Sequence, residues 1–396
     1  MAKPLEGVKV LDLSRILAGP YCTMLLGELG AEIVKVEIPE KGDDSRHFGP
    51  FKNGQSVYFI SINRGKKSIT VNLKSEEGIK IIKDMVKHFD ILIENFRPGT
   101  MEKLGIGYEV LKDINPRLIY AASSGFGHSG PDSKKPAYDM LMQAMGGMMS
   151  ITGWEDAPPT RVGMSIGDIG TSLFTAIGIN SALYQREKTG FGQKIDIAML
   201  DCQVALLENA VVRYQVDGKP PTPVGNRHPT ITPFQAFKAK DDYFVLPIGN
   251  DNLWVKFCNA VGKEELIADS QFVSNKARTE NIDILIPILD KMFITKNVQE
   301  WLNILQAKGI PCGPINSIDK VMDYEQIIAR NMIVEVDDEK AGITKIAGNA
   351  IKMTSIPENS NRNSAPKLGE HTQEILAEYL DYDEEKIKQL KNDGAI

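Results

Sequence analysis

The sequence predicts an α/β protein with a large doubly wound, Rossmann-like domain and a smaller α+β domain. Short apolar runs alternate with helical patterns over residues 8–211, as in parallel sheets that are covered by helices. The chain has 396 residues, more than one ordinary core accommodates. Residues 218–233, rich in proline, glycine and asparagine, then separate this pattern from a second one, and we interpret them as a linker.

The expected elements of the large domain follow one another in a regular order. A strand at residues 8–13, a helix that stops at Gly30 and a strand at residues 32–37 predict a right-handed parallel unit. The turn at residues 15–20 then lies at the carboxyl end of a strand, where open α/β sheets bind ligands. Because this turn lacks the G-x-G-x-x-G pattern, we do not expect a dinucleotide. Further strands are expected at 68–73, 90–94, 118–122 and 194–199, and further helices from Ser75 through Val86, up to Pro116, from within 161–170 to Gly190, and from an Asp201 cap through Val211.

The remaining chain is expected to form the smaller domain and a C-terminal segment that returns to the large one. Residues 234–238 and 243–247 have the pattern of an antiparallel hairpin. These assignments place the domains at residues 1–220, 221–330 and 331–396. Helices are also expected at 252–278, 284–293, 298–308, 370–380 and 384–390, and a second hairpin at 333–336 and 343–346.

Composition argues against several classes of partner. The net charge is −6, so we expect neither nucleic acid nor a membrane surface. We find no apolar run of bilayer length and no apolar signal-peptide core at the N-terminus. The four cysteines are far apart and form no C-x-x-C pair, which argues against a zinc site or a disulfide framework. We therefore expect a cytoplasmic protein.

Asp168 is the main functional candidate. It lies between Gly167 and Ile169-Gly170, and residues 172–182 after it form one apolar helical face. An aspartate at a helix start either caps the helix by accepting backbone N–H groups or serves as a reactive group. The adjacent glycines favour the second interpretation, since they let another molecule approach closely. The residues alone leave both interpretations open.

The same segment contains a second candidate. Residues 163–167, Gly-Met-Ser-Ile-Gly, match the G-x-S-x-G nucleophile elbow of serine hydrolases, which would make Ser165 the nucleophile. That motif requires a buried strand that leads directly into the helix. Residues 156–161 contain two prolines and several polar groups, and an H-G-G-G-type motif is missing. A serine esterase is therefore a weaker alternative.

Basic residues and histidines complete the candidates. No pair of histidines has the spacing of metal ligands, so we expect no metal site. His128, in the glycine-rich loop 123–131, is the histidine nearest the expected ligand, although a solvated loop histidine is the simpler account. Cations at the strand ends of the first domain would suit a ligand with phosphates. They are Arg15, Lys35, Arg46, Arg64, Lys66, Lys67, Lys74, Arg97 and Lys103.

Eight short segments become informative when they are taken together. They are Leu17-Ala-Gly19-Pro20, Asn63-Arg-Gly-Lys66, Glu94-Asn95-Phe96-Arg97-Pro98-Gly99, Gly125-Phe-Gly-His-Ser-Gly-Pro131, Ala137-Tyr138-Asp139, Gly167-Asp168, Thr189-Gly-Phe-Gly192-Gln-Lys and Gly225-Asn-Arg-His-Pro229. In this order they resemble the family III CoA-transferases, which include formyl-CoA, carnitine and bile-acid CoA-transferases and the α-methylacyl-CoA racemases. The similarity extends from about Gly7 to the C-terminus, and includes Gly309-Ile-Pro-Cys-Gly-Pro314 and Leu368-Gly-Glu-His371-Thr.

The resemblance implies an enzyme that moves CoA from an acyl-CoA thioester to a free organic acid, small or dicarboxylic. Arg15 or Arg227 could pair with a second carboxylate. The resemblance also implies an intertwined homodimer, each chain a ring threaded by its partner, in which the large domain holds CoA. Asp168, at the family's Gly-Asp position, would be the nucleophile. A carboxylate suits this task because it can attack a thioester, form a mixed anhydride and leave again.

The resemblance further implies which residues contact CoA. Phe96 and Met199 could equally be core residues, because apolar side chains at strand ends usually pack. Backbone N–H groups near Asp168 and at Leu17-Ala18 are the expected donors to the oxyanion. By position, Ile16 and Leu17 are expected around the thioester arm, Val71 and Lys74 near the adenine, Asn95, Phe96 and Lys103 around the phosphates, and Tyr138 and Met199 beside the reacting end.

The chain also departs from individual family members. Formyl-CoA transferase has Gln, Arg and Lys where this chain has Leu17, Ile38 and Pro136, and its tetraglycine loop has no counterpart near residues 224–228. These differences disfavour formate and oxalate as the substrate pair. The racemase branch has a G-H-D motif whose histidine moves the α-proton, and this chain has Tyr138 there. A two-base racemase is therefore disfavoured. Racemase-like proton transfer remains the first alternative, followed by the Ser165 esterase and an inactive CoA-binding protein.

Overall fold

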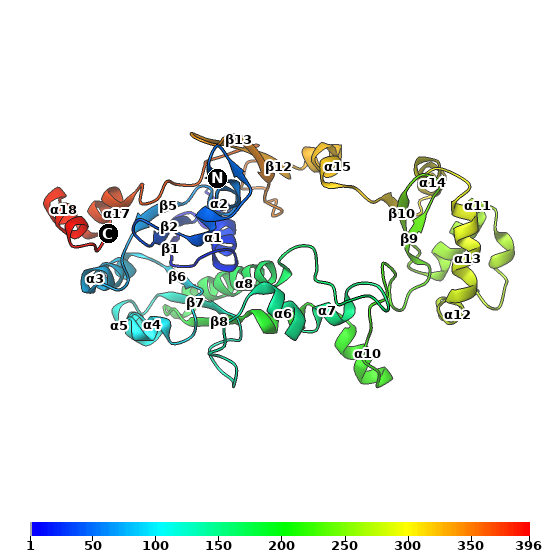
Figure 1. The fold of residues 1–396 in the computed structure, drawn as a ribbon, viewed down its shortest axis with the longest axis horizontal. Coiled ribbons are helices and arrows are strands. Elements are labelled where there is room, and N and C mark those ends of the chain that lie inside the picture. The colour runs from blue at the N-terminus through cyan, green and yellow to red at the C-terminus, as the bar shows by residue number, and fades with distance from the viewer. Residues whose placement is uncertain (1) are drawn as a thin grey trace. The chain divides into compact units, whose positions relative to one another are not determined.

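The computed structural model describes residues 2–396, which divide into two compact units. Unit 1 comprises the chain up to residue 148 together with residues 162–211 and 325–396. Unit 2 comprises residues 149–161 and 212–324. Each unit has its own apolar core, and Figure 1 shows the course of the chain through both.

Unit 1 is built on a six-stranded sheet with the order β5-β2-β1-β6-β7-β8, and every neighbouring pair is parallel. The chain builds one half of the sheet from β1 outward, then crosses back and builds the other half, which is the doubly wound order. This confirms the predicted α/β class. The strands are β1 (Lys9–Asp12), β2 (Glu32–Glu37), β5 (Lys67–Thr70), β6 (Ile91–Glu94), β7 (Ile119–Ser124) and β8 (Lys194–Ala198).

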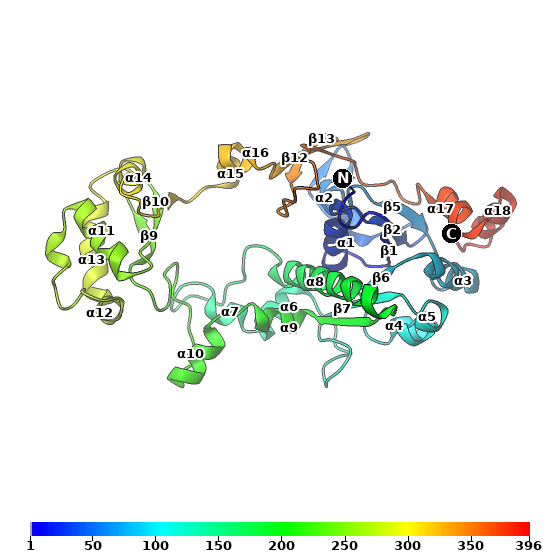
Figure 2. The same cartoon turned by 180° about the vertical axis from the view of Figure 1, so that it is seen from behind.

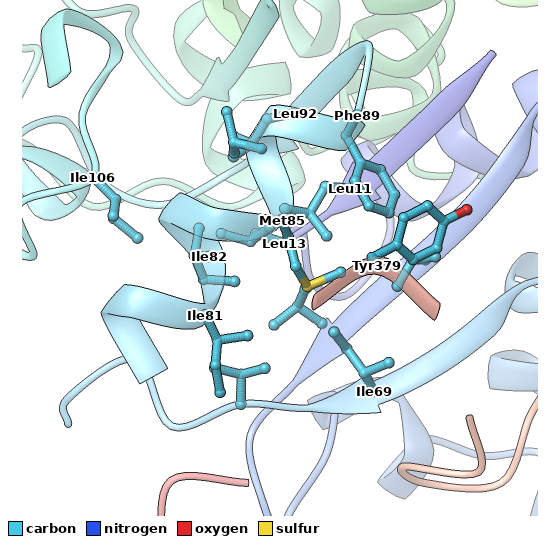
Figure 3. Packing of buried hydrophobic residues seen from close by; sticks show 14 of the residues in the cluster. Leu11, Leu13, Ile69, Ile81, Ile82, Met85, Phe89, Leu92, Ile106 and Tyr379 are labelled. Carbon is cyan, nitrogen blue, oxygen red and sulfur yellow. The ribbon is translucent and has the colours of Figure 1, made fainter. Parts of the chain in front are cut away.

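One face of this sheet packs against helices from both ends of the chain. Leu11, Leu92 and Tyr120 point to this face and belong to a fully buried cluster, part of which Figure 3 shows. Tyr379 brings a C-terminal helix into the same cluster, so the last residues complete the core of the first strands. The helices are α3 (Glu76–Met85), α4 (Thr100–Lys103), α5 (Tyr108–Ile114), α17 (Thr372–Leu380) and α18 (Glu384–Asn392).

The opposite face is covered by α1 (Ala18–Glu28) and the long helix α8 (Ile166–Thr189), which Figure 2 shows beside β7. Val10 and Ile93 alternate with the residues of the first face and pack here against Ile179 of α8. Helix α8 ends at Gly190, as predicted, and Gly190 adopts the left-handed conformation with φ of 80°.

Helix α9 (Met199–Ala205) differs from the prediction. It begins directly after β8, so Asp201 lies inside its first turn and is not its cap. The helix also does not continue to Val211, because Glu208 adopts a left-handed conformation with φ of 56° and α10 (Ala210–Asp217) forms separately. Elements of the described chain that the sequence did not indicate are β3 (Phe51–Lys52), β4 (Gln55–Ser56), α2 (Val57–Asn63), α6 (Asp139–Met145), α7 (Met148–Ile151), β11 (Gly313–Pro314), α15 (Ile318–Asp323), α16 (Glu325–Ala329), β14 (Asn361–Arg362), and the short 3-10 helices Asp44–His47 and Val86–His88.

Unit 2 contains the predicted hairpin of β9 (Phe234–Lys238) and β10 (Tyr243–Pro247), extended by β11 (Gly313–Pro314). Its core contains the aromatic residues Phe237, Trp254 and Phe293. The helix predicted at residues 252–278 is interrupted, since α11 (Asp251–Val261) ends at a left-handed Gly262. The other helices are the 3-10 helix Glu264–Leu266, α12 (Asn275–Glu280), α13 (Ile282–Phe293) and α14 (Val298–Gln306).

The second predicted hairpin forms in unit 1, as β12 (Ile333–Asp338) and β13 (Gly342–Ala347). Its buried residues Val334 and Val336 pack with Ile60 of α2. Within residues 2–396, we find no helix that combines the length and the hydropathy needed to cross a bilayer.

Candidate functional site

The loops after β1 and β6 meet where the winding direction of the sheet reverses. The backbone N–H of Arg15 donates to Asn95 Oδ1 over 2.8 Å, and Asn95 Nδ2 donates to the carbonyl of Arg15 over 2.8 Å. These strands are neighbours in the sheet, but their loops leave it in opposite directions. Such a switch point is the usual ligand site of an open α/β sheet.

A cavity of about 270 Å³ lies at this switch point. Four of the residues predicted to contact CoA line it together, namely Ile16, Asn95, Phe96 and Tyr138. Tyr138 exposes 76% of its surface, so it is available to a ligand. The other lining residues are Arg15, Arg97, Pro98, Ser124, Gly125, Lys135, Pro136 and Ala137.

A second cavity, of about 520 Å³, is strongly basic. Two predicted CoA residues, Lys74 and Lys103, line it together with Lys80 and Lys83. Helix α3 starts there, and Ser75 caps it by accepting the N–H of Gly78. Four ammonium groups and a helix start suit a ligand with several phosphates, although Glu76 also contributes a carboxylate.

The remaining predicted contacts lie elsewhere. Val71 is fully buried in the sheet core and lines neither cavity. Leu17 is buried at the start of α1. Met199 is buried too, and its sulfur lies 3.1 Å from where a side chain on Gly167 would begin. Met199 therefore packs against Gly167, the residue before Asp168.

Asp168 is the third residue of α8 and is partly buried. Ser165, not Asp168, occupies the N-cap position, so the interpretation of Asp168 as the cap is wrong. The hydroxyl of Ser172 donates to the carbonyl of Ala18 over 2.6 Å and lies 2.8 Å from the carbonyl of Asp168. This contact fixes the backbone of Asp168 against the start of α1, which begins at Ala18 directly after the turn at residues 15–17.

The electrostatic setting of Asp168 is unfavourable for a charge. Burial, followed by the negative charge of Asp139, raises the pKa of Asp168 to about 7. Tyr58 of α2 lies within electrostatic range of this carboxylate. Burial, followed by the charges of Asp168 and Asp43, raises the pKa of Tyr58 to about 12. A carboxylate whose pKa is perturbed by burial and by a like charge is typical of a functional site. Asp168 itself lines neither of the two cavities.

The turn that precedes α1 is strained and firmly held. Ile16 has φ of 69°, which is costly for a β-branched residue. Its N–H group lies 3.2 Å from both oxygens of Asp43. Asp43 is in turn paired with the fully buried Lys35 over 2.8 Å. This buried ion pair holds the turn in its strained conformation.

Most of the cations at strand ends are engaged in such internal pairs. Lys66, for example, is buried against Asp12 at 3.1 Å, so it is not available to a phosphate. The structure pairs Arg15 with Asp44, Lys35 with Asp43, Arg46 with Glu37, Arg64 with Glu28, Lys66 with Asp12, and Lys67 with Glu32 and Glu374. Lys74, Lys103 and Arg97 remain as cavity-lining cations.

Two other expectations are settled by position. Ser165 follows a segment without strand structure, so it does not form the nucleophile elbow of a hydrolase.

His128 is not a solvated loop residue: its Nδ1 lies 3.1 Å from the ammonium of Lys194, and its Nε2 lies 3.9 Å from Glu94. Among residues 2–396, we find no group of three His, Cys, Asp or Glu side chains that could hold a metal ion.

Sequence reasoning missed two residues of this site. Tyr58 lies on α2, a helix that the apolar pattern did not indicate, and only Ser56 as its cap could have suggested it. Asp139 was noted only within the Ala137-Tyr138-Asp139 segment, and its contact with Gly167 over 2.8 Å could not be deduced from spacing.

Comparisons with known proteins identify the family of the chain. The family model described as CoA-transferase family III matches residues 5–372. An acetyl-CoA:oxalate CoA-transferase from Acetobacter aceti is 43% identical over 377 residues, 95% of this chain and 96% of the relative. A succinyl-CoA:glutarate CoA-transferase from Mus musculus is 41% identical over 395 residues, 100% and 90% of the two chains. The crystal structure of a CaiB/BaiF family protein from Brucella suis has a TM-score of 0.83 and 39% identity, covering 96% of this chain and all of that one.

Proposed function

Because this chain belongs to the family III CoA-transferases, we propose that it moves CoA from an acyl-CoA to a free organic acid through an anhydride on Asp168. The observation that carries this proposal is the position of Asp168. It lies in the first turn of α8, and Ser172 fixes it against Ala18 at the start of α1. The residues that precede α1 include Ile16, which lines the smaller cavity together with Tyr138.

The chemistry follows from the carboxylate. One oxygen of Asp168 attacks the thioester carbon, the C–S bond breaks, and the electron pair leaves with the CoA thiolate, which gives a mixed anhydride. The thiolate then attacks the aspartyl carbon and releases the donor acid, leaving an aspartyl-CoA thioester. The acceptor carboxylate reverses these two steps and departs as the new acyl-CoA. No step consumes a proton or needs a metal.

The two cavities suggest how CoA is held. We assign the nucleotide phosphates to the basic cavity with Lys74 and Lys103, and the reacting end to the smaller cavity with Ile16, Asn95 and Tyr138. The ammonium groups would balance the phosphate charges. Val71, which is buried in the core of the sheet, would act through packing alone. The free cysteines of the described chain are compatible with a cytoplasmic enzyme.

Lys103→Met is expected to raise the KM for acyl-CoA by about fivefold to tenfold, the loss of one charge-assisted phosphate contact, with little change in kcat. Steady-state kinetics with acetyl-CoA or succinyl-CoA measures this. Lys112→Met removes an exposed lysine of α5 and serves as the control. An unchanged KM in Lys103→Met would place the phosphates elsewhere.

The acceptor is proposed to be a small dicarboxylic acid. The relatives from Acetobacter aceti and Mus musculus are named for oxalate and glutarate, and both are dicarboxylic acids. Arg15 lines the smaller cavity and offers a guanidinium that could meet the second carboxylate, although Asp44 already pairs with it. Arg227 belongs to unit 2 and does not line this cavity, so it gives no support to a contact with the second carboxylate.

Hydroxylamine trapping tests the proposal most directly. The enzyme is incubated with a panel of acyl-CoAs, treated with hydroxylamine, digested and mapped by mass spectrometry. A hydroxamate at Asp168 is expected with the true donor. An α-proton racemase would instead exchange the α-hydrogen of the acyl group in heavy water without any carboxyl-linked adduct. Absence of label at Asp168 during active transfer would refute the mechanism.

We also propose that two copies form an intertwined homodimer. Leu173, Ile177 and Tyr184 lie on one stripe of α8 and expose 46%, 61% and 67% of their surfaces. Helix α6 adds Met140 and Met145, which are also exposed. An apolar surface that spans two helices of one unit is typical of a protein interface.

Ile177→Glu is expected to shift the protein from dimer to monomer, because a carboxylate in an apolar interface is left without a partner. Size-exclusion chromatography with light scattering should give twice the chain mass for the wild type and the single chain mass for the variant. Val110→Glu, at an exposed position of α5, is the matched control and should remain dimeric. A monomeric wild type at micromolar concentrations would overturn the proposal.

A further inference from the structure

The first turn of α8 is capped from another helix. Ser165 occupies the N-cap position and makes no capping bond with its side chain. Asp139, the first residue of α6, instead accepts the backbone N–H of Gly167 over 2.8 Å. A side chain on Gly167 would begin 2.9 Å from that carboxylate oxygen, so glycine is what permits the approach. The cap is therefore a tertiary contact between α6 and α8, and it binds the N–H of Gly167, the residue before Asp168.

Asp139 is itself rigidly held. Its other oxygen accepts Nε2 of Gln143 over 2.8 Å, and Oε1 of Gln143 accepts the N–H of Val162 over 2.9 Å. Gln143 is fully buried and Asp139 nearly so. These bonds connect α6 to both ends of the segment that enters α8. The Asp139 carboxylate is consequently held by two hydrogen bonds, one from the backbone of Gly167 and one from the side chain of Gln143.

Asp139 is also the charged group that acts on Asp168. Among the described residues, burial and the Asp139 charge account for the pKa of Asp168, near 7. The other ionisable groups around this turn are Tyr58 on α2, which Asp168 itself perturbs, and Asp201 and Cys202 on α9. Tyr21 and Cys22 lie on α1, and Arg15 in the turn before it is paired with Asp44. No cation in this set neutralises Asp168.

We propose that Asp139 is a positioning residue for the transfer reaction: it fixes the first turn of α8, and its negative charge, bound at the residue before Asp168, makes the Asp168 carboxylate a more reactive nucleophile. This inference rests on the proposed role of Asp168. When an oxygen of Asp168 bonds to the acyl carbon and the C–S bond breaks, the negative charge leaves with the CoA thiolate. Repulsion between the two carboxylates is present before this step and absent after it, which favours the anhydride.

The pH dependence of kcat/KM in Asp139→Asn tests the proposal. The acid limb of the profile is the rise in kcat/KM on its acidic side. In the wild type this limb should lie near pH 7, where Asp168 becomes ionised. Removal of a like charge lowers the pKa of a carboxyl group, so the limb should move down by about one pH unit. The ratio of wild-type to variant kcat/KM should then increase about tenfold between pH 5.5 and pH 8.5. A purely structural role would lower activity by the same factor at every pH.

A second variant guards against misfolding. In Asp139→Asn/Gln143→Glu the donor and acceptor of the buried bond are exchanged, and the charge moves one side chain away from Asp168. Its acid limb should lie below that of the wild type and above that of Asp139→Asn. A limb at the wild-type position in either variant overturns the proposal. Asp201→Asn removes an exposed carboxylate from α9 and should leave the limb unchanged.

Failure of this inference is separable from failure of the proposed function. If hydroxylamine labels Asp168 in the wild type and the limb does not move in Asp139→Asn, the nucleophile stands and the role of Asp139 is refuted. If no label appears at Asp168, the proposed function itself fails. A labelled Asp168 together with a shifted limb supports both.

Discussion

Asp168→Ala is expected to reduce CoA transfer by a factor on the order of 10⁴ or more, because the group that accepts the acyl chain is removed. Binding of acyl-CoA should remain within about threefold of the wild type, since the residues around both cavities are unchanged. Label exchange between acyl-CoA and free acid measures the first quantity, and isothermal titration calorimetry measures the second. Asp168→Glu should also fail, because attack tolerates little displacement of the oxygen.

Loss of activity in Asp168→Ala must be separated from loss of structure. The start of α8 does not depend on this side chain, because the cap comes from Asp139. The pKa of Asp168 is about 7 in the folded protein, against 3.8 ordinarily, so the folded state binds this proton more tightly. The free energy of folding that this protonation contributes is fully present below pH 4 and is lost as the pH rises through 7.

The isosteric variant Asp168→Asn should therefore be more stable than the wild type at pH 8, by on the order of 2 kcal/mol after allowance for its partial exposure. The difference should vanish near pH 4. Thermal unfolding at the two pH values checks this. Substantial transfer by a well-folded Asp168→Ala would contradict the proposed nucleophile, whereas an unfolded variant would contradict this account of α8.

The sequence was sufficient where structure is determined locally. The strand β2, the hairpin of β9 and β10 and the end of α8 at Gly190 lie where the apolar patterns and the glycine predicted them. Alternating strands and helices also determined the doubly wound sheet, since short right-handed crossovers leave few other arrangements. The predicted CoA residues Ile16, Asn95, Phe96 and Tyr138 line one cavity. The first three lie in the loops that follow β1 and β6, and these two strands are neighbours in the sheet.

The rest depends on contacts between distant parts of the chain. Asp139 and Gly167 are 28 residues apart, and Arg15 and Asn95 are 80 apart. No periodic pattern reports such pairs. For the same reason, sequence reasoning offered Lys35 and Lys66 as phosphate ligands, whereas the fold buries both against carboxylates. A lysine at a strand end gives no indication of whether a carboxylate from another strand will meet it.

Lys66→Met is expected to destabilise the protein by about 3–5 kcal/mol, because it leaves a buried carboxylate without its main partner. The ammonium of Lys66 lies 3.1 Å from Asp12, 2.9 Å from the carbonyl of Pro20, 2.8 Å from Thr23 and 2.9 Å from Asn63. Both charged side chains are fully buried. Burial opposes the ionisation of Asp12, but the charges of Lys66 and Lys35 outweigh it and keep its pKa below the ordinary value.

Denaturant unfolding at two pH values identifies the cause of this loss. Without Lys66, Asp12 should take up a proton at higher pH, so the destabilisation should be smaller at pH 5 than at pH 8. Asp12→Asn/Lys66→Met removes both charges and should recover part of the stability, which a double-mutant cycle reports as a coupling energy. Lys112→Met, which breaks the exposed pair with Glu109, should change stability by less than about 1 kcal/mol.

The outcome also bears on function, because this ion pair supports the strained turn. Lys66 binds the carbonyl of Pro20, and Asp12 accepts the N–H of Ser14 over 3.0 Å. These contacts hold the two ends of the segment that contains Ile16. A folded Lys66→Met protein should therefore show a raised KM for acyl-CoA as well as reduced stability. Unchanged stability at pH 8, with no coupling to Asp12, would show that the buried charges are dispensable and that Ile16 and Asp43 suffice to maintain the turn.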